Sequence, residues 1–201
     1  MKSTLASALA LEAIHNDLAV SVADLDPEHR TITKWMADRV ERGIEPTFQV
    51  HEADNAAQAL QFFSGEELYI IDCPSRATAA TIEISKNVDL VIQPSTPGKK
   101  DLDLSVDTFH QLVGEGIPVN RLLLILTRVG TPAEFDRAKE YFKKAKTIDG
   151  QHFRILPSAI YEKTAYRASI SDGYAITETP YVSLNEAAKS VIYQSITVLN
   201  V

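Results

Sequence analysis

Cysteine is nearly absent from this chain, and long apolar runs are absent altogether. Cys73 is the only cysteine among 201 residues, which excludes an internal disulfide and any metal site built from paired cysteines. The five histidines are scattered and show no ligand spacing, so a metal site on histidine is disfavoured. No apolar run approaches the roughly 20 residues that a membrane-spanning helix needs. We therefore expect a cytoplasmic protein.

Positive charge is also in short supply. The chain carries 20 Lys and Arg against 27 Asp and Glu, a formal net charge of −7, which argues against a surface that coats nucleic acid or anionic membrane. Basic residues gather between 137 and 146, but acidic residues alternate with them, as on a solvated helix face. Lys189 is the only base in the closing segment 183–199. Non-specific DNA binding therefore has weak support, and we expect no membrane binding.

Apolar residues alternate along the chain between helical and extended spacing. We predict helices over residues 3–16, 32–42, 55–63, 77–86, 101–114, 131–145 and 183–199, and strands over residues 18–23, 47–50, 68–72, 90–94, 121–127 and 153–156. Such alternation is typical of a parallel sheet with helices on both faces. The length also fits one domain. We therefore predict a single doubly wound α/β domain over residues 1–201.

Three aspartates follow predicted strands at the point where each strand ends. Asp24 and Asp26 come after the strand 18–23, and Asp72 ends the strand 68–72. In an open parallel sheet, ligands bind beyond the carboxyl ends of the strands. Taken singly, each aspartate is better explained as a turn former, because Asp and Pro commonly follow strands. Their joint spacing favours a ligand site at this edge of the sheet.

The first predicted helix opens with a lysine and two hydroxyl residues. A lysine such as Lys2 can neutralise phosphate oxygens, and a hydroxyl such as that of Ser3 can hold Mg²⁺ together with a carboxylate. A second carboxylate can position the water that attacks a phosphate. Lys2-Ser3-Thr4 carries no signal alone, and it gains weight only from the aspartates downstream.

Three segments together resemble the ParA/MinD family of P-loop ATPases: Lys2-Ser3-Thr4, Ala23-Asp24-Leu25-Asp26-Pro27 and Tyr69-Ile70-Ile71-Asp72-Cys73-Pro74. Members of this family carry a deviant P-loop, Lys-Gly-Gly-x-Gly-Lys-[Ser/Thr]-[Ser/Thr], then an Asp-x-Asp-Pro turn roughly twenty residues later. A hydrophobic strand that ends in Asp-[Thr/Cys]-Pro follows. Segments 88–95, 102–104 and 155–173 continue the similarity, which is greatest with the short plasmid-partition members.

The resemblance implies roles for residues of the phosphate site. Lys2 falls on the P-loop lysine, Ser3 on the magnesium-coordinating hydroxyl, and Thr4 on the adjacent phosphate-contacting hydroxyl. Asp26 matches the carboxylate that positions the attacking water. Lys2 and Asp26 are therefore the expected catalytic residues.

The resemblance also implies contacts for the metal and the base, with ATP and Mg²⁺ as cofactors. Asp24 falls close to the metal, and Asp72 matches the strand-end carboxylate that holds a magnesium-bound water. Thr127 stands where many relatives have an asparagine that contacts adenine, a departure that weakens base selectivity. Pro157 and Ser158 would lie near the base.

The implied function is that of a ParA-like ATPase in the segregation of plasmid or chromosomal DNA, with ATP-dependent dimerisation as its switch. The implied partners are a second copy of the chain, forming a homodimer, and a DNA-bound adaptor protein of ParB type. A MinD-like role in membrane patterning is disfavoured, because the closing segment lacks a basic amphipathic face.

The front of the chain departs from the family pattern. No glycine loop precedes Lys2, and the signature lysine of the family has no counterpart. We expect weak binding of ATP and Mg²⁺ and turnover near background, because one lysine cannot replace several oriented backbone donors. The lack of the strand before the loop should also leave strand edges open. Two explanations remain: a shortened form of a complete ATPase, which we favour, or a non-hydrolysing ParA-like interaction protein.

Overall fold

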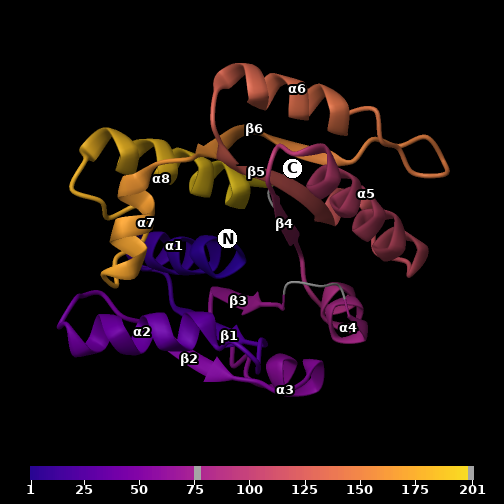
Figure 1. Cartoon of the computed structure of the whole chain (residues 1–201). Coiled ribbons are helices and arrows are strands. Elements are labelled where there is room, and N and C mark those ends of the chain that lie inside the picture. The colour runs from indigo at the N-terminus through magenta and orange to yellow at the C-terminus, as the bar shows by residue number, and fades with distance from the viewer. Residues whose placement is uncertain (75–77, 199–201) are drawn as a thin grey trace. The chain divides into compact units, whose positions relative to one another are not determined.

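The computed structural model describes residues 1–74 and 78–198, which fall into two compact units (Figure 1). The first unit holds Met1–Thr81 with Thr164–Ile192, and the second holds Ile82–Lys163 with the end of the chain from Tyr193. Each unit has its own three-stranded parallel sheet and is described by itself. No helix in the described ranges is long and apolar enough to cross a membrane.

The first unit contains the strand ends and the helix start of the predicted phosphate site. Its elements are α1 (Lys2–Ile14), β1 (Val20–Asp24), α2 (Thr31–Glu41), β2 (Gln49–Glu52), α3 (Ala56–Gln61), β3 (Leu68–Asp72), α7 (Thr164–Ser171) and the greater part of α8 (Val182–Thr197).

Strand β1 lies at the centre of the first sheet, which has the order β2-β1-β3. All of β1 from Ser21 to Asp24 is buried. The parallel pairing sets Asp24 opposite Glu52 on one side and opposite Asp72 on the other. Carboxylates from three strands therefore stand in one row at the edge where ligands bind in open α/β sheets.

Helix α1 is apolar on nearly every side and forms the core of the first unit. Every residue from Leu5 to Ala13 is buried. Alanine and leucine dominate this run and favour a helix, and a helix that is apolar all round is stable only when it is covered. α1 packs against β1, β3 and α2. Its first turn brings Lys2 and Ser3 to Asp72 at the carboxyl edge of the sheet.

A fully buried arginine joins α2 to the segment before α8. The side chain of Arg39 has no exposed surface, and its Nη1 and Nη2 donate to the two carboxylate oxygens of Glu178 at 2.7 Å each. Nε donates to the Pro46 carbonyl at 2.8 Å, and Nη1 donates to the Gly173 carbonyl at 3.0 Å. The guanidinium carbon lies 5.5 Å from the centre of the Trp35 ring. These contacts fix α2 at its carboxyl end.

The second unit is built around an apolar central strand. Its sheet has the order β4-β5-β6, formed by Val91–Ser95, Leu122–Val129 and Arg154–Tyr161. Helices α5 (Lys99–Gly114) and α6 (Pro132–Phe142) pack against this sheet, and α4 (Ala79–Asn87) and a short 3-10 helix, Val119–Arg121, precede β4 and β5. Rings from Phe109, Phe142 and Phe153 meet in the core with centroids 5.3 to 6.3 Å apart.

The predicted α/β class is confirmed, because the sheets are parallel and helices pack against them. The strand predicted at 47–50 is found at Gln49–Glu52, and the strand predicted at 153–156 continues to Tyr161 as β6. The sequence reading misses α7, which has only eight residues. Residue 77 of one predicted helix and residue 199 of another lie outside the described residues.

The strands form two three-stranded sheets rather than one continuous ladder. Within the described part of the chain, β3 pairs with β1 alone and β4 pairs with β5 alone. The first four residues of each of these strands are half-buried. The prediction of open strand edges stays a prediction. The prediction of one domain over the whole chain stays a prediction.

We expect Arg39→Ala to lower the free energy of unfolding by about 3–5 kcal/mol, because the Glu178 carboxylate would remain largely buried without its partner. Urea denaturation followed by circular dichroism measures this change. Arg42→Ala, at the C-cap of the same helix, is the matched control: its pair with Asp172, at 3.7 Å, is exposed on both sides and should contribute less than about 1 kcal/mol. Equal effects of the two substitutions would contradict the role given to Arg39.

Candidate functional site

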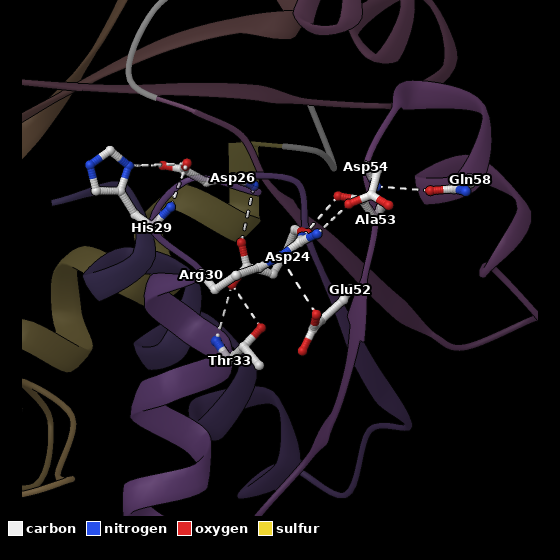
Figure 2. A network of polar contacts seen from close by, with 9 residues as sticks. All are labelled: Asp24, Asp26, His29, Arg30, Thr33, Glu52, Ala53, Asp54 and Gln58. Carbon is white, nitrogen blue, oxygen red and sulfur yellow. Dashed lines mark hydrogen bonds and ion pairs between the residues drawn. The ribbon is translucent and has the colours of Figure 1, made fainter.

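Asp24 is fully buried at the end of β1, and the protein itself supplies partners for both of its carboxylate oxygens (Figure 2). Oδ1 accepts a hydrogen bond from the Asp26 backbone N–H at 3.1 Å. Oδ2 accepts from the backbone N–H and the hydroxyl of Thr33 at 3.1 and 2.8 Å. These bonds serve the first turn of α2, whose N-cap residue, Arg30, makes no side-chain cap. Asp24 therefore fixes the turn after β1 to the start of α2.

Asp26 follows in the same turn and is bound by His29. The side chain of Asp26 is 16% exposed, and its Oδ1 accepts from the His29 backbone N–H at 3.2 Å. The His29 Nδ1 lies 3.1 Å from Oδ1 and 3.2 Å from Oδ2. Burial alone would raise the pKa of Asp26, but hydrogen bonds from the His29 side chain and backbone bring it below that of an ordinary aspartate. Asp26 is therefore held as a charged carboxylate.

Arg30 closes the turn and connects it to the end of β2, as Figure 2 shows. Its Nη1 donates to the carbonyls of Asp24 and Ala53 at 2.6 and 2.9 Å. Its Nη2 donates to Asp54 Oδ1 at 2.5 Å, and its Nε lies 3.6 Å from Glu52 Oε2. One guanidinium thus holds two neighbouring strand ends together.

Asp72 ends β3 and is 4% exposed. Burial raises the pKa of Asp72 to about 6; a hydrogen bond from the Ser3 side chain opposes this rise, the charge of Asp24 adds to it, and the charge of Lys2 opposes it again. Ser3 and Lys2 therefore offset only part of the cost of burying a negative charge on Asp72. Asp24 differs, because both of its carboxylate oxygens accept hydrogen bonds from the protein.

Lys2 lies among these acidic groups at the start of α1. Burial lowers the pKa of Lys2, while attraction to Asp72, Cys73 and Asp26 raises it. Burial also raises the pKa of the Cys73 thiol to about 12, so this group is protonated and unreactive at neutral pH. The first unit thus brings together five of the predicted site residues: Lys2, Ser3, Asp24, Asp26 and Asp72.

The other four predicted contacts are placed as follows. Thr4 is half-buried in the first turn of α1. Thr127 is buried in β5 of the second unit, where its hydroxyl donates to a backbone carbonyl of β4 at 3.3 Å. Pro157 is exposed in β6, and the hydroxyl of Ser158 donates to Gln194 at 2.8 Å. Contact of these residues with a nucleotide stays a prediction.

Sequence reasoning misses His29, Arg30 and Glu52. The strand predicted at 47–50 stops two residues short of Glu52, so the third acidic strand end goes unseen. His29 and Arg30 follow the Asp26-Pro27 turn, whose prediction as a site rests on its aspartates alone. A basic pair two residues after the proline of such a turn is the signal that points to them.

The acidic edge fits Mg²⁺ only in part. Within residues 1–74 and 78–198, no three His, Cys, Asp or Glu side chains are grouped to hold a metal ion by themselves. Mg²⁺ at phosphate sites commonly uses one or two carboxylates, while phosphate and water supply the other ligands. Asp72, with Ser3 beside it, fits that chemistry because its buried charge lacks full compensation. Asp24 fits less well, because both of its oxygens already accept protein hydrogen bonds.

Comparison with known proteins gives this geometry a context. A scan against models of protein families finds no match. Protein ParA of Rhizobium radiobacter is 25% identical over 187 residues, which cover 86% of this chain and 78% of that protein. The septum site-determining protein MinD of Pyrococcus horikoshii OT3, solved with Mg-ADP, aligns with a TM-score of 0.71 at 15% identity, over 98% of this chain and 90% of that one. The predicted resemblance to ParA/MinD-type P-loop ATPases is confirmed.

Another ParA/MinD-type structure agrees. The putative plasmid partition protein of Borrelia burgdorferi B31, bound to AMPPNP, aligns with a TM-score of 0.66 at 15% identity, over 96% of this chain and 92% of that one. At these identities the structural likeness establishes the ParA/MinD-type fold.

We expect Asp72→Asn to stabilise the protein at pH 8 in metal-free buffer by about 1–3 kcal/mol, because a carboxyl with a pKa of about 6 is costly to ionise in the fold. An ordinary aspartate ionises near pH 4, so the unfolded chain loses this proton first. Wild-type stability is therefore lost as pH rises from about 4 to about 6, and the advantage of the variant should shrink towards zero only as pH falls below about 4.

Urea denaturation across this pH range, with EDTA present, measures the difference. Asp26→Asn is the matched comparison and should change stability in the opposite direction, because the pKa of Asp26 is lowered by its hydrogen bonds with His29. A variant of Asp72 that is less stable than wild type at pH 8 would show that its charge is well compensated.

Proposed function

We propose that the protein is a ParA-like ATPase that acts in the segregation of plasmid or chromosomal DNA in the cytoplasm. The observation that carries the proposal is the convergence of Lys2, Ser3, Asp26 and Asp72 at the carboxyl edge of one sheet. The ParA/MinD-type fold and the sequence similarity to Protein ParA support an ATPase. The likeness to a putative plasmid partition protein favours a role in partition.

Each of these side chains has surroundings that suit a distinct task. Lys2 would neutralise phosphate oxygens of ATP, and Ser3 and Asp72 would hold Mg²⁺. Bound Mg²⁺ supplies positive charge that stabilises the phosphates during transfer. Asp26, held charged by His29, would accept a hydrogen bond from the attacking water and orient it. Asp24 would act on the site through the turn that it fixes.

We further propose that ATP binding switches the chain from monomer to homodimer and that a DNA-bound adaptor of ParB type reads the dimer. Thr4 would contact phosphate, and Thr127, Pro157 and Ser158 would contact the base, as the resemblance implies. The alternative is a non-hydrolysing ParA-like protein that uses the fold for interaction. The observation that favours this alternative is the engagement of the Asp26 carboxylate by His29.

Titration of the 201-residue chain with millimolar MgATP, followed by amide NMR and by phosphate release, tests the proposal. We expect weak, magnesium-dependent binding that Lys2→Ala reduces at least roughly tenfold, because the lysine supplies the charge closest to the phosphates. Asp26→Asn should bind within about twofold of wild type and lose at least roughly tenfold in any turnover, since its role lies in the transition state.

Asp38→Asn is the control, because Asp38 is an exposed carboxylate on α2 away from the acidic edge. It should change neither binding nor turnover. The same titration on a version extended through a glycine loop separates the two readings. No magnesium-dependent shift in either version would rule out the ATPase and leave the interaction protein.

A further inference from the structure

Arg30 adopts a backbone conformation that arginine rarely occupies. Its φ and ψ are +48° and +49°, in the left-handed region that suits glycine, and it is the N-cap residue of α2. Its backbone N–H donates to the Asp26 carbonyl at 2.8 Å, and its carbonyl accepts from Lys34 at 3.0 Å. Unfavourable backbone conformations persist where surrounding contacts over-determine them, and they concentrate at functional sites.

The side chain of Arg30 supplies those contacts. It is 15% exposed, and Nη1 reaches two backbone carbonyls, those of Asp24 at the end of β1 and Ala53 just beyond β2. The carboxylates of Asp54 and Glu52 are 70% and 58% exposed, so their pairing with Arg30 contributes little. The two hydrogen bonds to backbone carbonyls therefore contribute most to holding Arg30 in place. Ala53 is fully buried, so removal of the guanidinium would take a hydrogen-bond donor away from a buried carbonyl.

Hydrogen bonds from the backbone and from the side chain of Arg30 both hold the turn 24–30. The Arg30 backbone binds the Asp26 carbonyl, and the Arg30 guanidinium binds the Asp24 carbonyl two residues earlier. The carboxylate of Asp26 is in turn bound by the N–H of His29, the residue immediately before Arg30 (Figure 2). The direction in which Asp26 points thus depends on where Arg30 is anchored.

We propose that Arg30 is a positioning residue for Asp26: by tying the turn 24–30 to the end of β2, it sets the orientation of the Asp26 carboxylate. The part of this inference that concerns turnover rests on the proposed ATPase function. The part that concerns the geometry of the turn does not, and the two can be tested separately.

Amide hydrogen exchange reports the turn directly. The N–H groups of Asp26 and His29 are protected by carboxylates of the turn, so their exchange rates follow its geometry. In Arg30→Gly, which keeps the left-handed conformation accessible and removes the guanidinium, we expect both amides to exchange at least roughly tenfold faster. The amides of Val22 and Ile70, inside β1 and β3, should keep their wild-type rates.

Two further variants make the result specific. Arg30→Lys keeps a positive charge, but its ammonium lies one bond nearer the backbone than Nη1, the nitrogen that binds both carbonyls, so it should recover at most part of the protection. Lys34→Ala removes an exposed cation one turn further along α2 and should change nothing. Wild-type exchange at Asp26 and His29 in both Arg30 variants would overturn the proposal whatever the turnover.

Kinetics then test the link to turnover. With MgATP, we expect kcat of Arg30→Lys per folded enzyme to fall at least roughly fivefold while KM stays within about twofold. Circular dichroism gives the folded fraction by which the measured rate is divided, because loss of folded protein alone also lowers apparent kcat at constant KM. A change in KM alone would overturn the link to Asp26. If wild type shows neither binding nor turnover even when extended through a glycine loop, the ATPase function fails, and the exchange rates still decide whether Arg30 positions Asp26.

Discussion

The parallel pairing of β1 with β2 and β3 is the constraint on which the candidate site depends. This register sets Asp24 between Glu52 and Asp72, and like charges at neighbouring strand ends repel one another. Each carboxylate is met by a different partner: the turn and α2 for Asp24, Arg30 for Glu52, and the start of α1 for Asp72. The turn after β1 and the first turns of α1 and α2 thus supply partners for Asp24 and Asp72.

Asp24 and Asp72 show how adjacent positions in one register acquire different chemistry. Both are buried and both end a strand, but Asp24 accepts three hydrogen bonds from groups that the turn and α2 supply. Burial leaves Asp72 with a pKa of about 6 despite its hydrogen bond from Ser3. The oxygens of Asp24 thus have hydrogen-bond donors within the fold, whereas the charged form of Asp72 would be stabilised more by an added positive charge.

Much of this fold is visible in the sequence because its signals are local. Apolar periodicity marks the helices and strands, and a proline one or two residues after Asp26 and Asp72 marks the strand ends where they lie. The partners of those aspartates are not local: Arg30 and Ala53, for example, are 23 residues apart and meet only through the register of β1 with β2. Left-handed backbone at an arginine also leaves no mark in composition or spacing.

The division of the strands between two sheets is another feature that periodicity cannot give. Each predicted strand looks the same in the sequence whether it pairs on one side or on two, since half-buried β3 is as apolar as a central strand. The family resemblance, rather than any local pattern, led to the expectation of open strand edges. The roles of Thr127, Pro157 and Ser158 at the base are likewise implied by the family resemblance. The hydrogen bonds that Thr127 and Ser158 make within the protein neither support nor oppose these roles.

The burial of Arg39 has a consequence for how this sequence can change over generations. Its partner Glu178 lies 139 residues away, so the two codons mutate independently although the side chains share one dry environment. Replacement of either residue alone leaves the other charge buried without its partner, while joint replacement by apolar residues of similar volume can be tolerated. Related chains should therefore hold both residues or neither, and correlated variation at positions 39 and 178 would trace this packing through the family's history.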